Sequence, residues 1–113
     1  MTGTNEKRCV LSFEQNQEEL LIFIKGEIDH YGAVAVRGRI DEKINELRPR
    51  SAVLVLSGID FMDSSGIGLI IGRSEVCTEL GASIRLKGLS ERNKKLLRLS
   101  GIEKITNLTI SDV

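Results

Sequence analysis

Aromatic residues are scarce: the sequence has no tryptophan, three phenylalanines and one tyrosine. Proteins that hold single-stranded nucleic acid stack the bases on aromatic side chains, and this chain has few of them. Its 16 basic and 16 acidic residues cancel, so no net field draws it to nucleic acid or to an anionic membrane. No apolar run approaches the roughly 20 residues that span a bilayer. We therefore expect neither nucleic acid nor a membrane as a partner.

Cysteine is rarer still, with two residues. Cys9 and Cys77 lie in separate apolar segments and lack the spacing of metal ligands. They are expected to be reduced, half-buried thiols in a cytoplasmic protein, and no metal or other cofactor is expected. Residues 1–8 are polar and do not form a signal peptide, which agrees with a cytoplasmic location.

The pattern of apolar residues predicts an α/β protein, and 113 residues make one domain of common size. Cys9 to Phe13 and Leu20 to Ile24 are predicted strands, and the short polar turn between them makes the pair antiparallel. Apolar residues then recur every three or four positions from Ala33 to Leu47, as in an amphipathic helix. Asp29 is placed to cap this helix and Pro49 to stop it.

The second half of the chain alternates strand and helix. Ala52 to Leu56 has no polar residue, as expected of a central strand covered on both faces. A second helix follows and should end at Gly81. The side chains expected to form its buried face are Ile67, Ile70, Ile71, Cys77 and Leu80.

Ser83 to Lys87 alternates as a more exposed strand does. Ser90 then begins a third helix, which buries leucines and ends at Gly101; these leucines are Leu96, Leu97 and Leu99. The short segment from Ile102 to Ile110 fits neither pattern clearly. We predict a single domain over 1–113 with a core of about 9–108, built on a mixed, mostly parallel sheet of about four to five strands with interleaved helices.

The stretch from Phe61 to Arg73 joins the central strand to the second helix, and it places Asp63, Ser64, Ser65 and Gly66 together. Small polar side chains supply partners for the free N–H groups of a first helical turn. The same groups favour a bound anion. The stretch is therefore either a helix cap alone or a cap that also presents a functional hydroxyl, at the sheet edge where ligands usually meet α/β proteins.

The parts of a catalytic site are missing. Neither serine has a glycine two residues before it, as a nucleophile elbow requires. A catalytic triad needs a histidine, and His30, at a helix start, is expected to face solvent. Gly66, Gly68 and Gly72 lie inside the helix instead of preceding it, so they are expected to pack the helix on the sheet and not to bind a dinucleotide. We do not expect an enzyme.

Two segments resemble the signature segments of STAS domains: Gly26-Glu27-Ile28-Asp29-His30, and Phe61-Met62-Asp63-Ser64-Ser65-Gly66-Ile67-Gly68. A third, around Leu99-Ser100-Gly101-Ile102, is similar as well. Within this family the chain resembles most the sporulation-type anti-sigma factor antagonists. The resemblance covers about residues 9–108. It also implies a further C-terminal helix, which Ser111-Asp112 looks placed to cap.

The resemblance implies a mechanism. The unphosphorylated antagonist binds an anti-sigma factor that is also a serine kinase, and the sigma factor is released. The kinase, which binds ATP and magnesium, phosphorylates Ser64, and the modified protein dissociates until a serine phosphatase restores it. The implied partner-binding residues are Asp29, His30, Phe61, Met62, Asp63, Ser64, Ser65, Gly66 and Arg73.

Several of these roles have alternatives. Asp29 is either a partner contact beside Ser64 or only a helix cap, and Ser65 is expected to cap or shape the turn. One of Phe61 and Met62 should face the core and the other the partner. Arg73 is expected to be a solvated charge unless it meets the partner.

Two other functions stay open. The chain could be a STAS subunit of a stress-sensing or lipid-transport complex. It could also be a small nucleotide-binding or hydrolytic domain.

Overall fold

The computed structural model describes residues 9–112. The elements in chain order are β1 (Cys9–Gln15), β2 (Glu19–Ile28), α2 (His30–Leu47), β3 (Ser51–Met62), α3 (Ser64–Glu79), β4 (Ser83–Lys87), α4 (Glu91–Leu99), the 3-10 helix η1 (Ile102–Lys104) and β5 (Leu108–Ile110). One sheet contains all five strands, in the order β1-β2-β3-β4-β5. β1 runs antiparallel to β2, and the other neighbours are parallel. The predicted α/β class and mixed, mostly parallel sheet are confirmed.

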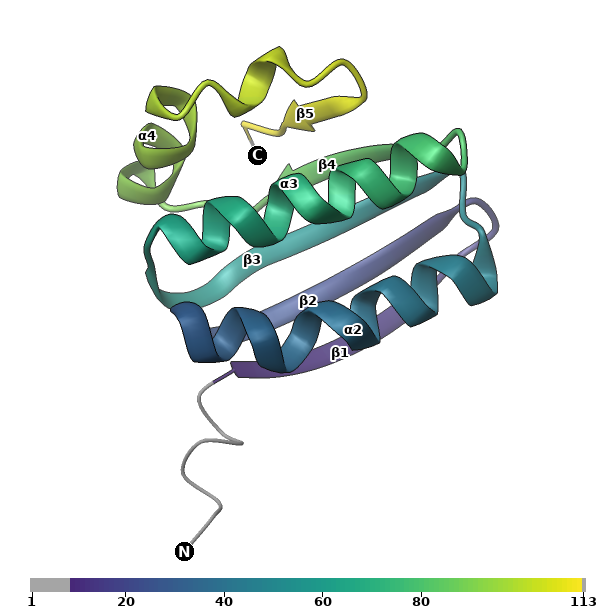
Figure 1. Ribbon diagram of the computed structural model, residues 1–113, viewed down its shortest axis with the longest axis horizontal. Coiled ribbons are helices and arrows are strands. Elements are labelled where there is room, and N and C mark those ends of the chain that lie inside the picture. Colours follow the sequence, from purple (N-terminus) through teal and green to yellow (C-terminus); the bar gives the residue numbers. More distant parts are fainter. Residues whose placement is uncertain (1–8, 113) are drawn as a thin grey trace, which may run out of the picture.

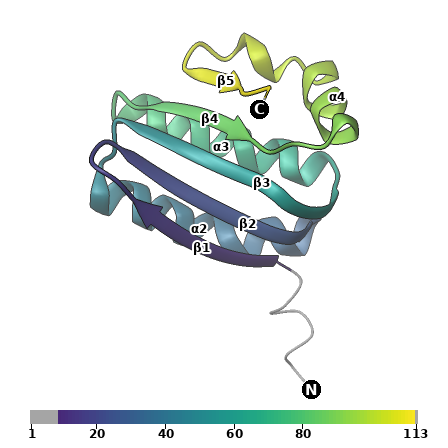
Figure 2. The ribbon, with the colours of Figure 1, turned by 180° about the vertical axis from the view of Figure 1, so that it is seen from behind.

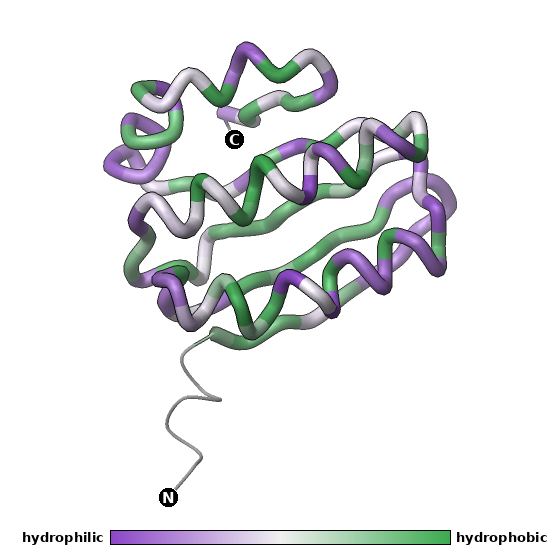
Figure 3. Tube along the Cα trace, viewed as in Figure 1, coloured by the Kyte–Doolittle hydropathy of each residue, from purple (hydrophilic) through white to green (hydrophobic). Residues whose placement is uncertain are grey.

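Helices α2 and α3 lie side by side on one face of the sheet (Figure 1). The view from behind shows β1 to β4 in front of both helices (Figure 2). β5 forms the edge of the sheet next to β4, and α4 and η1 lie at the same end of the molecule (Figures 1 and 2). The core is therefore the layer between the sheet and the helix pair, and the apolar central strands run along it (Figure 3).

Helix α2 begins and ends where its sequence predicts. The carboxylate of Asp29 accepts a hydrogen bond of 2.8 Å from the backbone N–H of Gly32. Arg48 takes a left-handed conformation, with φ of 46°, and Pro49 follows. The apolar side of the helix is buried as expected, and its buried apolar residues are Ala33, Val36, Ile40 and Ile44.

The buried faces of the later helices differ from the prediction. In α3, Ile71 is exposed, whereas Leu69 is in the core. In α4, Leu97 is fully buried but Leu99 is 78 % exposed. Periodicity identifies an apolar side, but α3 packs on both the sheet and α2, and its buried side therefore also includes Arg73 and other polar groups.

The strand β3 is longer than the apolar run that predicts it, because it continues to Met62. The segment from Ile102 to Ile110 resolves into η1 and β5. Beyond it, the N–H of Ser111 donates to the carbonyl of Leu86, and Asp112 pairs with Arg98. Ser111 therefore extends the pairing between β4 and β5, and Asp112 connects this segment to α4.

None of the helices within residues 9–112 is both long and apolar enough to span a membrane.

Candidate functional site

Two helices begin next to each other at one edge of the sheet. Ile28 and Met62 are paired residues at the ends of the parallel strands β2 and β3. Each is followed by an aspartate that caps a helix: Asp29 caps α2, and Asp63 caps α3 through a 2.8 Å hydrogen bond from the N–H of Ser65. The two helix N-termini therefore meet at this edge, where the sequence predicts Asp29 and Ser64 to lie together.

Ser64 is the first residue of α3, and it is exposed. The capping oxygen comes from Asp63, so of the two roles expected of Ser65, capping the helix or shaping the turn, the first is wrong: Ser65 supplies the N–H that is capped. The reason is the chain geometry, since the cap is the last non-helical residue and Asp63 already occupies it. Ser64 is consequently held at a fixed position without a capping role of its own.

The residues beside Ser64 divide between core and surface. Met62 is 1 % exposed, and Phe61 is 40 % exposed, because successive strand residues point to opposite faces. Gly66 is buried against the side chain of Met62. Met62 and Gly66 thus support the site from inside, and in this structure neither is on the surface where a partner contact was expected.

A groove separates α2 from α3 just behind the two helix starts. It encloses about 350 Å³, and its lining residues are His30, Ala33, Val34, Arg37, Ser65, Gly68, Leu69, Gly72 and Arg73. A Cβ atom added to Gly68 or Gly72 would meet nothing within 4 Å. These two glycines therefore leave the groove open, and the expectation that they bring the helix close to the sheet holds for Gly66 alone.

Arg73 is buried, with 8 % of its surface exposed, so the expected solvated charge is wrong. Its Nε lies 2.6 Å from Oδ1 of Asp41, and its Nη2 donates to Oδ2 at 3.1 Å. This ion pair, with its hydrogen bond from Nη2, ties α3 to α2 beside the groove. Asp41 precedes Arg73 by 32 residues, so no pattern of neighbouring residues predicts this ion pair.

Sequence reasoning also missed the apolar surface near the helix starts. Tyr31 and Val34 on α2 are exposed large apolar side chains, as is Phe61 at the end of β3. Arg37 on the groove wall is exposed too. Only the packing of α2 beside α3 shows that Val34, Arg37 and Ser65 border one groove.

The described residues contain no group of three or more His, Cys, Asp and Glu side chains that could hold a metal ion. His30 is exposed, as predicted, and its ring lies edge-on to that of Tyr31 at 5.5 Å. Cys9 and Cys77 are free thiols, more deeply buried than expected. Burial, and secondarily Asp41, raises the pKa of Cys77 to about 11, and burial also raises the pKa of Cys9. Neither thiol is poised as a nucleophile at neutral pH.

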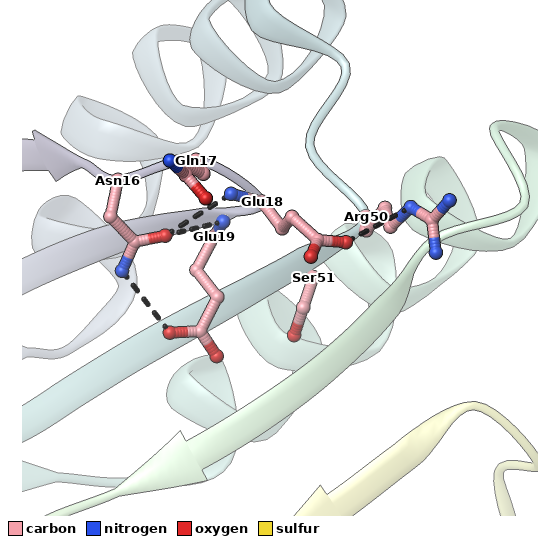
Figure 4. A pocket seen from close by; sticks show the side chains of 6 residues that line it. All are labelled: Asn16, Gln17, Glu18, Glu19, Arg50 and Ser51. Atoms are coloured by element: carbon pink, nitrogen blue, oxygen red, sulfur yellow. Dashed lines mark hydrogen bonds and ion pairs between the residues drawn. The ribbon is translucent and has the colours of Figure 1, made fainter.

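A more open hollow of about 540 Å³ lies at the opposite end of the sheet, by the β1–β2 turn (Figure 4). Its polar groups bind one another. Oδ1 of Asn16 accepts from the N–H groups of Glu18 and Glu19, and Glu18 pairs with Arg50 at 3.1 Å. The polar groups of this hollow therefore stabilise the β1–β2 turn. The two helix starts remain the candidate site.

The five-stranded sheet, the two helices on one face and the capped Asp–Ser turn are the arrangement expected of a STAS domain. The model of the STAS domain family matches residues 11–113, and the chain belongs to this family.

Among its relatives, an anti-sigma F factor antagonist of Paenibacillus polymyxa is 31 % identical over 103 residues, which are 91 % of this chain and 88 % of that protein. An anti-sigma-B factor antagonist of Bacillus subtilis (strain 168) is 33 % identical over 98 residues, covering 85 % and 86 %. The resemblance drawn from the signature segments is confirmed.

Solved structures agree on the fold. A putative anti-sigma factor antagonist from Thermotoga maritima has a TM-score of 0.79 at 16 % identity, covering 91 % of this chain and 87 % of that one. The antagonist SpoIIAA in its unphosphorylated form has a TM-score of 0.70 at 23 % identity, with coverages of 92 % and 89 %. The Bacillus cell fate determinant SpoIIAA in its phosphorylated form has a TM-score of 0.68 at 24 % identity, with coverages of 90 % and 91 %.

Proposed function

We propose that this chain is an anti-sigma factor antagonist whose binding to an anti-sigma factor with serine kinase activity is ended by phosphorylation of Ser64. The proposal rests mainly on the exposed position of Ser64 at the start of α3. Relatives that cover most of the chain are named anti-sigma F and anti-sigma-B factor antagonists, which supports a regulatory binding protein rather than an enzyme.

Ser64 suits a kinase substrate because it is accessible while its backbone is fixed. The hydrogen bond from Ser65 to Asp63 anchors the turn on one side, and the bond from the N–H of Gly66 to the carbonyl of Asp63 closes it. A kinase would therefore meet the backbone of Ser64 in one conformation. ATP and magnesium belong to the partner kinase in this scheme, and a separate serine phosphatase resets the protein in the cytoplasm.

Phosphorylation should leave the fold nearly unchanged. A phosphate adds about −1.5 to −2 charges at pH 7. The N-terminus of α3 attracts this charge by about 0.3–1 kcal/mol. The carboxylate of Asp63 next to it opposes this attraction. Because these two effects nearly cancel, phosphorylation has to act by lowering the affinity for the partner and not by changing the fold.

Only a modest change at the interface is needed. A hundredfold loss of affinity corresponds to about 2.8 kcal/mol. A doubly charged group placed in a desolvated interface supplies a penalty of that size. The exposed side chains of Phe61 and Tyr31 near Ser64 would form the apolar part of this interface.

The test is phosphorylation with a cognate anti-sigma kinase and ATP, with the modified residue identified by mass spectrometry. We expect a single phosphate on Ser64, none on the Ser64→Ala variant, and normal modification of the matched Ser65→Ala variant. Modification at Ser65 instead, or at neither serine, would contradict the proposal.

A second test separates binding from folding. Ser64→Asp should bind the kinase about a hundredfold more weakly, the change that about 2.8 kcal/mol produces. Its unfolding midpoint should stay close to that of the wild type. Equal binding by both proteins would rule out a charge switch at this position.

A further inference from the structure

The sheet face that turns away from α2 and α3 is not covered by any other described helix (Figure 2). Side chains alternate along each strand, so every second residue points to this face. On β2 the residues with buried side chains face the helices, and Leu21 and Phe23, which alternate with them, point the other way. Neither belongs to the core cluster that the helices cover, although both are large and apolar.

The pairing register arranges this face in rows. Glu14 on β1 is opposite Leu21, which is opposite Val53, which is opposite Arg85 on β4. The row reads acid, apolar, apolar, base across four strands, and its accessible apolar surface comes from Leu21, since Val53 is 0 % exposed within the single chain. A half-turn about an axis parallel to the strands reverses the order, so that acid lies over base and apolar over apolar.

The next row repeats the apolar centre. It consists of Ser12, Phe23, Val55 and Lys87 on the same four strands. Under the same half-turn, Phe23 lies over Val55 and Ser12 over Lys87. Two successive rows are therefore complementary to themselves under one rotation, as an interface between two identical chains requires.

Each of the two charged side chains at the ends of the first row can form a further ion pair. Within residues 9–112, Glu14 forms no ion pair, and the Nη2 of Arg85 pairs with Glu19 on its own chain at 3.3 Å. The Nε of Arg85 is buried without a hydrogen-bond partner. A guanidinium has five N–H donors and the side chain of Arg85 is 43 % exposed, so Arg85 can keep Glu19 and still donate from its exposed N–H groups to a second carboxylate.

We propose that a second copy of this chain docks on this face, with a two-fold axis running parallel to the strands between β2 and β3. Glu14 of each copy then meets Arg85 of the other, and Leu21 and Phe23 on β2 pack over β3 of the other copy. The dimer uses the sheet face opposite the helices, so Ser64 and the α2–α3 groove stay open in both copies.

The contact area sets the expected strength. Four strands at about 4.8 Å spacing and six residues at about 3.3 Å cover roughly 400 Å² per copy. This is about half of a standard interface, which buries about 800 Å² per partner. The dimer should therefore be weak, and sedimentation equilibrium over a wide concentration range is the suitable measurement.

Charge reversal tests the arrangement. Glu14→Arg and Arg85→Glu should each weaken the dimer about tenfold or more, because each puts like charges together in both contacts. The double variant Glu14→Arg/Arg85→Glu should restore it, and an equimolar mixture of the two single variants should form a heterodimer. Glu42→Arg, on the exposed side of α2, carries the same charge change and should have no effect.

Two results would overturn the proposal: a wild-type protein that remains monomeric up to its solubility limit, or single variants that dimerise as the wild type does. A dimer that the double variant does not restore would also refute this axis, since only this rotation joins Glu14 to Arg85. Phe23→Ser provides an independent check, because it removes apolar contact without altering charge. Circular dichroism of each variant verifies that the fold is intact.

Discussion

Replacing Gly66 by alanine tests how tightly α3 packs on the sheet beside Ser64. A Cβ at this position would lie 2.6 Å from the Sδ of Met62 and closer still to its Cγ. Because Met62 is buried, its side chain has to move against the core. Such overpacking costs about 1–3 kcal/mol. Alanine recovers about 1 kcal/mol over glycine in a helix, and the net destabilisation should reach up to about 2 kcal/mol.

Gly68→Ala is the matched control. It makes the same substitution in the same helix, but its added Cβ has no neighbour within 4 Å. It should therefore stabilise the protein by the propensity difference alone, about 1 kcal/mol. Subtracting the two variants cancels the propensity, so Gly66→Ala should be less stable than Gly68→Ala by the overpacking energy, about 1–3 kcal/mol.

Equilibrium unfolding in urea, followed by far-ultraviolet circular dichroism because the chain has no tryptophan, measures both variants. The slope of the unfolding free energy against urea concentration should be equal for the two variants, so their unfolding midpoints can be compared directly. If Gly66→Ala were stabilised as much as Gly68→Ala, the close packing of α3 on Met62 would be refuted.

Three further predictions concern caps, the buried ion pair and a thiol. Asp63→Ala should lower the unfolding free energy by about 1 kcal/mol, and Asp63→Asn should recover most of it, because asparagine also caps helices. Asp41→Ala should lower the free energy of unfolding by about 1–3 kcal/mol, because it leaves the guanidinium of Arg73 without its partner. Arg73→Met should then lower the free energy of unfolding less in the Asp41→Ala background than in the wild type. A double-mutant cycle of urea unfolding measures this difference. The raised pKa of Cys77 should make stability fall as pH rises from 9.0 towards about 11, since the unfolded chain releases this proton first. The stability contributed by the protonated thiol is complete below pH 9.0, and Cys77→Ala should have a shallower fall over that window; equal slopes would contradict the assignment.

Much of the fold follows from contacts between residues close in the chain. Asp29 and Ser90 were expected to begin helices, and both side chains accept the capping hydrogen bond. Gly81, with φ of 71°, follows the end of α3 as expected. These features depend on backbone groups within a few residues, so the sequence contains all the information that they need.

Part of the candidate site could be predicted from the sequence for the same reason. The turn of Asp63 and Ser64 is local chemistry, and its place after a central strand puts it at the edge of the sheet. The sequence predicted that Phe61 and Met62 divide between core and surface, but not which of them is buried, because the strand had to be known to continue through both residues before their faces could be assigned.

The sequence by itself determined the elements from β1 to α4, their order, the caps at Asp29 and Ser90 and the position of Ser64 at a helix start. Only the tertiary structure decided that Arg73 is buried against Asp41, that Leu99 is exposed, and that Glu14 and Arg85 end one row of the open sheet face. The physical reason is that a pattern along the chain reports an element's own apolar side, whereas the neighbours of that side are residues distant in sequence. Their positions are set by how helices and strands pack on one another.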